Sequence, residues 1–147
     1  MAQILAKAGY NLILTYGNDV EAAQFVQAEF TEKFNTEIFI LQADITSEKS
    51  IQVIFDFLKR KDIRLFSLIF NAGITSRTRF EDIKQEEWER VFYANVHFPV
   101  FLLQKILSRI EIGGNVLFTG SLMGVYPHSV SLSYGVTKSA VHALVPT

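Results

Sequence analysis

Short apolar runs that alternate with helical patterns constrain the fold of this chain more than any other feature. Runs typical of buried parallel strands occupy residues 11–16, 37–41, 65–70 and 115–118. Apolar residues at helical spacing predict helices before Gly9, over residues 20–34, 47–59 and 85–110, and from about Ser133 onward. Because such alternation is typical of parallel βαβ units, we expect an α/β fold: a Rossmann-like, doubly wound parallel sheet between two layers of helices.

The spacing within the first two helices also predicts which of their side chains are buried. The face expected to be buried on the first helix consists of Ile4, Leu5 and Ala8. The face expected to be buried on the second consists of Ala22, Phe25, Val26 and Phe30.

Composition narrows the class of protein. The 147 residues suit one domain, and a hydrophobic content of 49% is ample for a core. A net charge of −1 argues against a nucleic-acid or membrane-surface protein, and the absence of cysteine excludes disulfides and thiolate metal sites. The three histidines are scattered, so we expect no metal. The first residues lack the pattern of a signal peptide, which favours a cytoplasmic location.

A tyrosine and a lysine four residues apart indicate the chemistry. On a helix, Tyr134 and Lys138 share a face, so the ammonium can lie beside the phenol. A nearby positive charge favours the phenolate and lowers a tyrosine pKa from its usual ~10, toward the range that acid–base catalysis needs. Ser121, thirteen residues before Tyr134, adds a hydroxyl that can hold a substrate carbonyl. For the pair alone, a surface helix with an exposed lysine is the simpler interpretation.

Four short motifs occur together in order along the chain. They are Asn71-Ala72-Gly73-Ile74-Thr75, Ala94-Asn95-Val96, Phe118-Thr119-Gly120-Ser121 and Tyr134-Gly135-Val136-Thr137-Lys138. Together they resemble the short-chain dehydrogenase/reductase family. The Asn-Ala-Gly-Ile-Thr segment followed by Trp88 is similar to the 3-oxoacyl-acyl-carrier-protein reductase branch of that family.

The resemblance implies a set of site residues. Those implied to be catalytic are Asn95, Ser121, Tyr134 and Lys138. Those implied to bind the cofactor are Asp44, Ile45, Asn71, Ala72, Gly73, Tyr134 and Lys138. Two of these assignments have structural alternatives: Asp44 as the N-terminal cap of the next helix, and Asn71-Ala72-Gly73 as a plain turn. His128, between Ser121 and Tyr134, either lines the substrate mouth or is an exposed loop residue.

Pro99 lies inside the predicted helix over residues 85–110, where it cannot donate to the carbonyl of Asn95. A simple kink explains this placement on local grounds. The resemblance implies a further role, in which that carbonyl holds a water in a proton relay to Lys138.

The cofactor implied is NADP, with NAD less favoured. Relatives that prefer NAD carry an acidic residue where Tyr16 stands, and its carboxylate repels the 2′-phosphate of NADP. Compared with the family, residues 1–147 are expected to be a partial NAD(P)-binding Rossmann domain, without the first strand, its glycine-rich turn and the C-terminal strands. Pro146 is expected to end the last helix.

The function expected is reduction of a carbonyl to a secondary alcohol by a Ser-Tyr-Lys mechanism that uses NAD(P)H. A narrower version is reduction of a 3-oxoacyl thioester in fatty acid biosynthesis. The alternative is a catalytically silent nucleotide-binding or assembly domain of the same fold. The resemblance also implies a homodimer or homotetramer, built through residues 96–107 and the helix after Tyr134.

Overall fold

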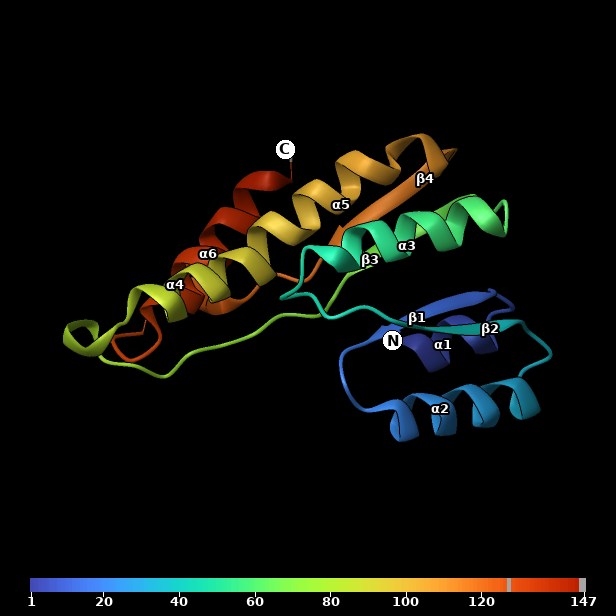
Figure 1. The fold of residues 1–147 in the computed structure, drawn as a ribbon, viewed down its shortest axis with the longest axis horizontal. Coiled ribbons are helices and arrows are strands. Elements are labelled where there is room, and N and C mark those ends of the chain that lie inside the picture. The colour runs from blue at the N-terminus through green and yellow to red at the C-terminus, as the bar shows by residue number, and fades with distance from the viewer. Residues whose placement is uncertain (127, 146–147) are drawn as a thin grey trace. The chain divides into compact units, whose positions relative to one another are not determined.

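The computed structural model describes residues 1–126 and 128–145, so Pro146, expected to end the last helix, lies outside the described residues. The chain divides into two compact units, Met1–Asp44 and Ile45–Thr147. Each unit combines helices with one pair of parallel strands (Figure 1).

The first unit contains, in order, α1 (Ala2–Lys7), β1 (Leu12–Tyr16), α2 (Val20–Lys33) and β2 (Ile38–Gln42). The two strands are parallel, in a register that runs from Leu12 opposite Ile38 to Tyr16 opposite Gln42. Asp19 caps α2, since its carboxylate accepts a hydrogen bond of 2.9 Å from the Ala22 N–H.

The core of this unit comes from both helices and both strands. Its buried members are Ala6, Leu12, Phe30 and Ile38. Side chains that pack around them are Ala2, Leu5, Leu14, Val26 and Phe34.

The faces predicted for α1 and α2 were only partly right. Val26 and Phe30 face the core, but Phe25 is 68% exposed and Ile4 is 73% exposed. Ala8 and Ala22 are exposed as well. Consecutive residues point about 100° apart on a helix, so Phe25 and Val26 cannot both face a narrow core. The spacing of apolar residues predicts that a helix has a buried face, but it does not show which of two adjacent apolar residues lies on that face.

The second unit contains α3 (Lys49–Arg60), β3 (Leu65–Phe70), η1 (Phe80–Asp82), α4 (Gln85–Phe92), η2 (Tyr93–His97), α5 (Phe98–Ile106), η3 (Leu107–Arg109), β4 (Ile110–Phe118), η4 (Leu122–Gly124) and α6 (Leu132–Leu144). Strands β3 and β4 are parallel, with Ser67 opposite Asn115 and Phe70 opposite Phe118. The Phe70 and Phe118 rings stack with their centroids 4.8 Å apart, so both strands end at one place. Parallel pairing in both units confirms the predicted α/β class.

The helix predicted over residues 85–110 is confirmed as helical from Gln85 to Arg109, but it differs from a single α-helix in two respects. It is interrupted at Tyr93–His97 by a π-helical segment, in which the Phe98 N–H donates to the Tyr93 carbonyl. Pro99 lies just after this segment, in the first turn of α5, and cannot donate to the carbonyl of Asn95. The α-helix also ends at Ile106, and Ile110 begins β4 opposite Leu65. Ile106 and Ile110 have helical spacing, but the second of them belongs to the sheet.

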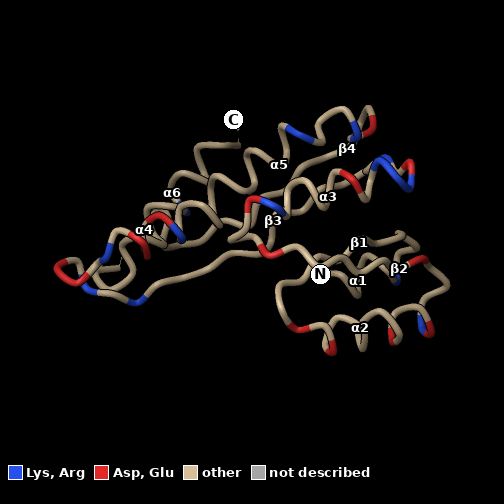
Figure 2. Tube along the Cα trace, in the orientation of Figure 1, with Lys and Arg blue, Asp and Glu red and all other residues tan. Residues whose placement is uncertain are grey.

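Charges of both signs stand beside one another along α3 and α4 (Figure 2). No helix among the described residues is long and apolar enough to cross a membrane. The same part of the chain holds no group of three or more His, Asp or Glu side chains placed to bind a metal.

Candidate active site

Lys138 lies at the centre of a polar cluster where β3 and β4 end. Its side chain is on α6 and is only 6% exposed. The Nζ atom donates to the Thr119 carbonyl at 2.6 Å and lies 5.7 Å from the centroid of the Tyr134 ring. The alternative of an exposed surface lysine is therefore wrong. The i, i+4 spacing on α6 places the ammonium beside the tyrosine ring.

Burial lowers the pKa of Lys138 from its ordinary value, because the charged ammonium loses hydration. An ammonium carries three donors, and the Thr119 carbonyl takes one of them. Two N–H groups remain for other acceptors.

Thr119 links this lysine to the end of the neighbouring strand. Its N–H donates to the Phe70 carbonyl at 2.9 Å, and its hydroxyl donates to the Asn71 side chain at 3.1 Å. Asn71, Ala72 and Gly73 are exposed at this strand end. In α/β sheets, ligands bind at the carboxyl ends of the strands. The segment is therefore open to a ligand at the edge where one is expected.

Asn95 ties the segment after β3 to α6. It lies in the π-helical segment η2 and is 3% exposed. Its side chain accepts from the Ile74 N–H at 2.9 Å, and donates to the Ile74 carbonyl at 2.9 Å and to the Thr137 hydroxyl at 3.0 Å. Thr137 is fully buried next to Lys138 in the chain. The amide thus fixes the backbone beside Gly73, while the water relay through the Asn95 carbonyl stays a prediction.

Gly73 is packed closely against two of the predicted site residues. A Cβ at this position would lie 3.1 Å from Oδ1 of Asn95 and 3.7 Å from Nζ of Lys138. The Asn95 side chain therefore leaves little room for a Cβ here.

Ser121 is placed by the turn that follows β4. Its hydroxyl accepts a hydrogen bond of 3.2 Å from the Met123 N–H and so caps the short helix η4. Accepting this bond leaves the hydroxyl proton available to donate elsewhere.

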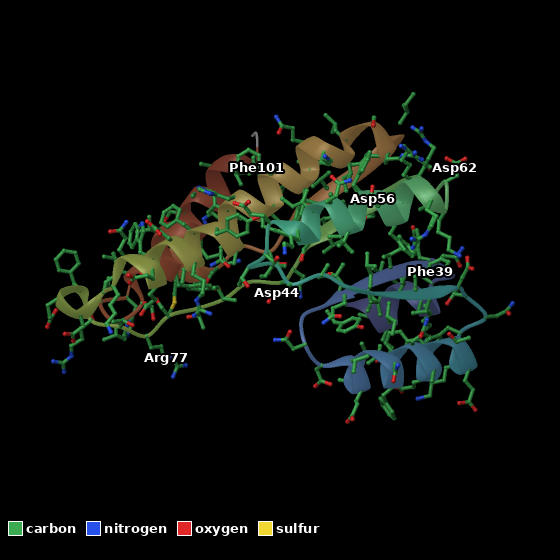
Figure 3. The ribbon with its side chains drawn as sticks, viewed as in Figure 1. Phe39, Asp44, Asp56, Asp62, Arg77 and Phe101 are labelled. Carbon is green, nitrogen blue, oxygen red and sulfur yellow. The ribbon has the colours of Figure 1, made fainter. Side chains whose placement is uncertain are left out.

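Asp44 and Ile45 lie on either side of the boundary between the two units. Asp44 is the last residue of the first unit, on the segment after β2 (Figure 3), whereas the Lys138 cluster belongs to the second. The N-cap of α3 is Glu48, so the interpretation of Asp44 as the cap of that helix is wrong. A contact of Asp44 and Ile45 with the cofactor stays a prediction.

Three contributors to the site were missed by sequence reasoning. Thr119 contributes its backbone carbonyl, and because every residue has one, the residue type does not indicate this role. Thr137 lies within the Tyr134–Lys138 motif but bonds to Asn95, 42 residues away in sequence. His142 lies four residues after Lys138, just as Lys138 lies four residues after Tyr134. This spacing is the one sequence signal that could have indicated His142.

Comparison with known proteins places this arrangement in a family. The family model described as short chain dehydrogenase matches residues 1–147. Elsinochrome reductase 1 from Elsinoe fawcettii is 29% identical over 99% of this chain and 54% of its own length. A trihydroxynaphthalene reductase from Pestalotiopsis fici is 28% identical over 99% of this chain and 51% of its own length. The chain thus spans about half the length of these curated relatives.

A solved structure supports the same assignment. The landomycin C-6 ketoreductase LanV, crystallised with NADP and rabelomycin, is 25% identical, with a TM-score of 0.88 over 97% of this chain and 60% of that one. This likeness confirms the Rossmann-like α/β prediction. On the family match over its whole length, the chain belongs to the short-chain dehydrogenase family.

Proposed function

We propose that this protein is an NADPH-dependent reductase that converts a ketone to a secondary alcohol. The observation that carries the proposal is the buried Lys138 ammonium, held 2.6 Å from the Thr119 carbonyl and 5.7 Å from the Tyr134 ring centroid. Burying an ammonium group costs free energy, and titratable groups with perturbed pKa values gather at functional sites.

The residues present fit a dinucleotide. Asn71, Ala72 and Gly73 are exposed at the end of β3, and Lys138 retains two donors that suit ribose hydroxyls. When bound, NADPH would supply a hydride to the carbonyl carbon. The absence of an acidic residue at Tyr16 favours NADPH over NADH.

Each side chain of the cluster has a proposed part in the chemistry. The Tyr134 hydroxyl gives its proton to the carbonyl oxygen. Lys138 fixes the ribose and keeps a positive charge near the phenol. Ser121, whose hydroxyl oxygen accepts from the Met123 N–H, donates a hydrogen bond to the substrate oxygen and stabilises the charge that develops there.

The relatives and the surface beside Ser121 support a proposal for the substrate class. The named relatives reduce elsinochrome and trihydroxynaphthalene, and LanV holds rabelomycin. In this chain Leu122, Val125 and Tyr126 follow Ser121 and are exposed apolar residues. A multi-ring aromatic ketone suits such a surface, so we propose this class in preference to the 3-oxoacyl thioester of fatty acid biosynthesis.

The wider setting stays a proposal. Exposed Phe101 on α5 and exposed Leu107 at the start of η3 support assembly as a homodimer or homotetramer through α5 and α6. A cytoplasmic location likewise stays a prediction.

The test uses protein expressed from the complete gene and follows NADPH consumption with two probes, 1-tetralone and an acetoacetyl thioester. We expect faster turnover of the bicyclic ketone, and faster turnover with NADPH than with NADH. Faster turnover of the thioester would overturn the substrate class. NADPH binding without reduction of any carbonyl would favour the catalytically silent alternative.

A further inference from the structure

The loop that follows β4 rests on α6 along much of its length. A Cβ at Gly124 would lie 2.8 Å from the backbone carbonyl carbon of Lys138, so the two backbones are in contact. The Ser139 hydroxyl donates to the Gly124 carbonyl at 2.6 Å. At the start of α6, a Cβ on Gly135 would lie 3.1 Å from the Met123 carbonyl oxygen. This end of the loop is therefore docked firmly on the helix.

His142 meets the other end of the same loop. Its Nε2 atom accepts a hydrogen bond from the Ser121 N–H, at a distance of 3.5 Å. A Cβ on Gly120 would lie 2.6 Å from that Nε2 atom, and a Cβ on Gly124 would lie 2.9 Å from the ring carbon Cε1. The imidazole thus occupies space that exists only because glycines stand on both sides of the serine turn.

We propose that His142 is a positioning residue for Ser121. The inference rests on the reductase function proposed above and names a residue that this function did not include. Tyr134, Lys138 and His142 follow one another at intervals of four residues, so they share a face of α6. By holding the backbone N–H of Ser121, the imidazole sets where the serine hydroxyl stands relative to the tyrosine on the same helix.

The direction of this contact is set by the backbone, because the Ser121 N–H can only donate and Nε2 accepts.

The contact is also long and lies at the surface, so its contribution to folding is small. Loss of the imidazole should therefore be seen in kcat rather than in the melting temperature.

The first experiment compares His142→Leu and His142→Gln in protein expressed from the complete gene. We expect His142→Leu to lower kcat for the ketone roughly two- to fivefold, the low end of the effect of one hydrogen bond because the contact is long, with an unchanged KM for NADPH. His142→Gln should recover most of the loss, because its carbonyl can accept from the Ser121 N–H. Wild-type kcat in His142→Leu, or equal losses in both variants, would overturn the proposal.

The second experiment tests the contact itself through Gly120. The methyl group added by Gly120→Ala must displace the imidazole, so this variant should reproduce the kcat loss of His142→Ala. The double variant Gly120→Ala/His142→Ala should lose no more than either single variant. Losses that multiply would show that the two residues act separately and would contradict the proposal. Gly17→Ala is the control, since nothing lies within 4 Å of a Cβ there.

A readout without turnover separates this inference from the function on which it rests. Amide hydrogen exchange at Ser121 should be faster in His142→Leu than in wild type, because the N–H loses its acceptor. An absence of ketone reduction in the wild type would sink the proposed function. Unchanged exchange at Ser121 would sink the role of His142, whatever the activity.

Discussion

At the scale of single residues, the ammonium group of Lys138 has one observed partner, the Thr119 carbonyl, and one proposed partner, the cofactor ribose. The Thr119 carbonyl fixes its position with one hydrogen bond, and the remaining donors are available for a ribose. Burial lowers its pKa but the hydrogen bond compensates part of the lost hydration. The residue is therefore held in place before any ligand arrives.

Replacing this lysine should weaken cofactor binding. In Lys138→Met we expect the Kd of NADPH to rise by at least about tenfold, because hydrogen bonds from a charged donor are lost. The measurement is calorimetric titration of the complete protein. Lys33→Met is the control, since Lys33 forms only an exposed ion pair with Glu29. Equal affinities in Lys138→Met and wild type would contradict the ribose contact.

Residues brought together by local spacing could be predicted, and residues brought together by the fold could not. Tyr134 and Lys138 are one helical turn apart, so their proximity follows from helix geometry. The bond between Asn95 and Thr137 joins residues 42 apart in sequence, and it depends on how η2 packs beside α6. Nothing in the sequence around either residue indicates it.

At the scale of elements, the serine loop and α6 behave as one packed piece. Gly124→Ala should separate them, because the added methyl meets the backbone of Lys138 at 2.8 Å and no flexible side chain can yield. We expect a loss of about 1–3 kcal/mol in the free energy of unfolding, measured by urea denaturation. Gly17→Ala, in open space, should stay within about 0.5 kcal/mol of wild type. Similar values for the two variants would refute the close packing of loop and helix.

The elements themselves could be predicted to different degrees. All four strands were found from their short apolar runs, although β4 begins at Ile110, earlier than the predicted residue 115. The predicted helix boundaries were wrong where the local sequence pattern fits both a helix and another structure. Ile110 continues a helical spacing but pairs with Leu65 in the sheet, and Pro99 interrupts a helix without revealing the π-helical segment before it.

At the scale of the whole molecule, the sheets limit stability. Within the described residues, β1 pairs only with β2 and β3 only with β4. Two-stranded sheets are marginal by themselves, since their backbone groups on the outer edges lack partners. Large apolar side chains on β3 and β4 also remain exposed, among them Phe66 and Leu117.

Residues 1–147 expressed alone should therefore be poorly stable and should bind NADPH weakly. The measurements are thermal unfolding by circular dichroism and a fluorescence titration with NADPH. A broad transition at low temperature and weak affinity are expected. A sharp cooperative transition together with micromolar NADPH affinity would show that these residues need nothing further.

The central claim is that Tyr134 gives the proton in a carbonyl reduction, and turnover by Tyr134→Phe tests it most directly. The substitution removes only the hydroxyl and keeps the ring beside Lys138. In the complete protein we predict that kcat for ketone reduction falls roughly 10²–10⁴-fold, the usual contribution of a general acid, while the Kd of NADPH stays within about twofold. Turnover close to that of the wild type would contradict the account.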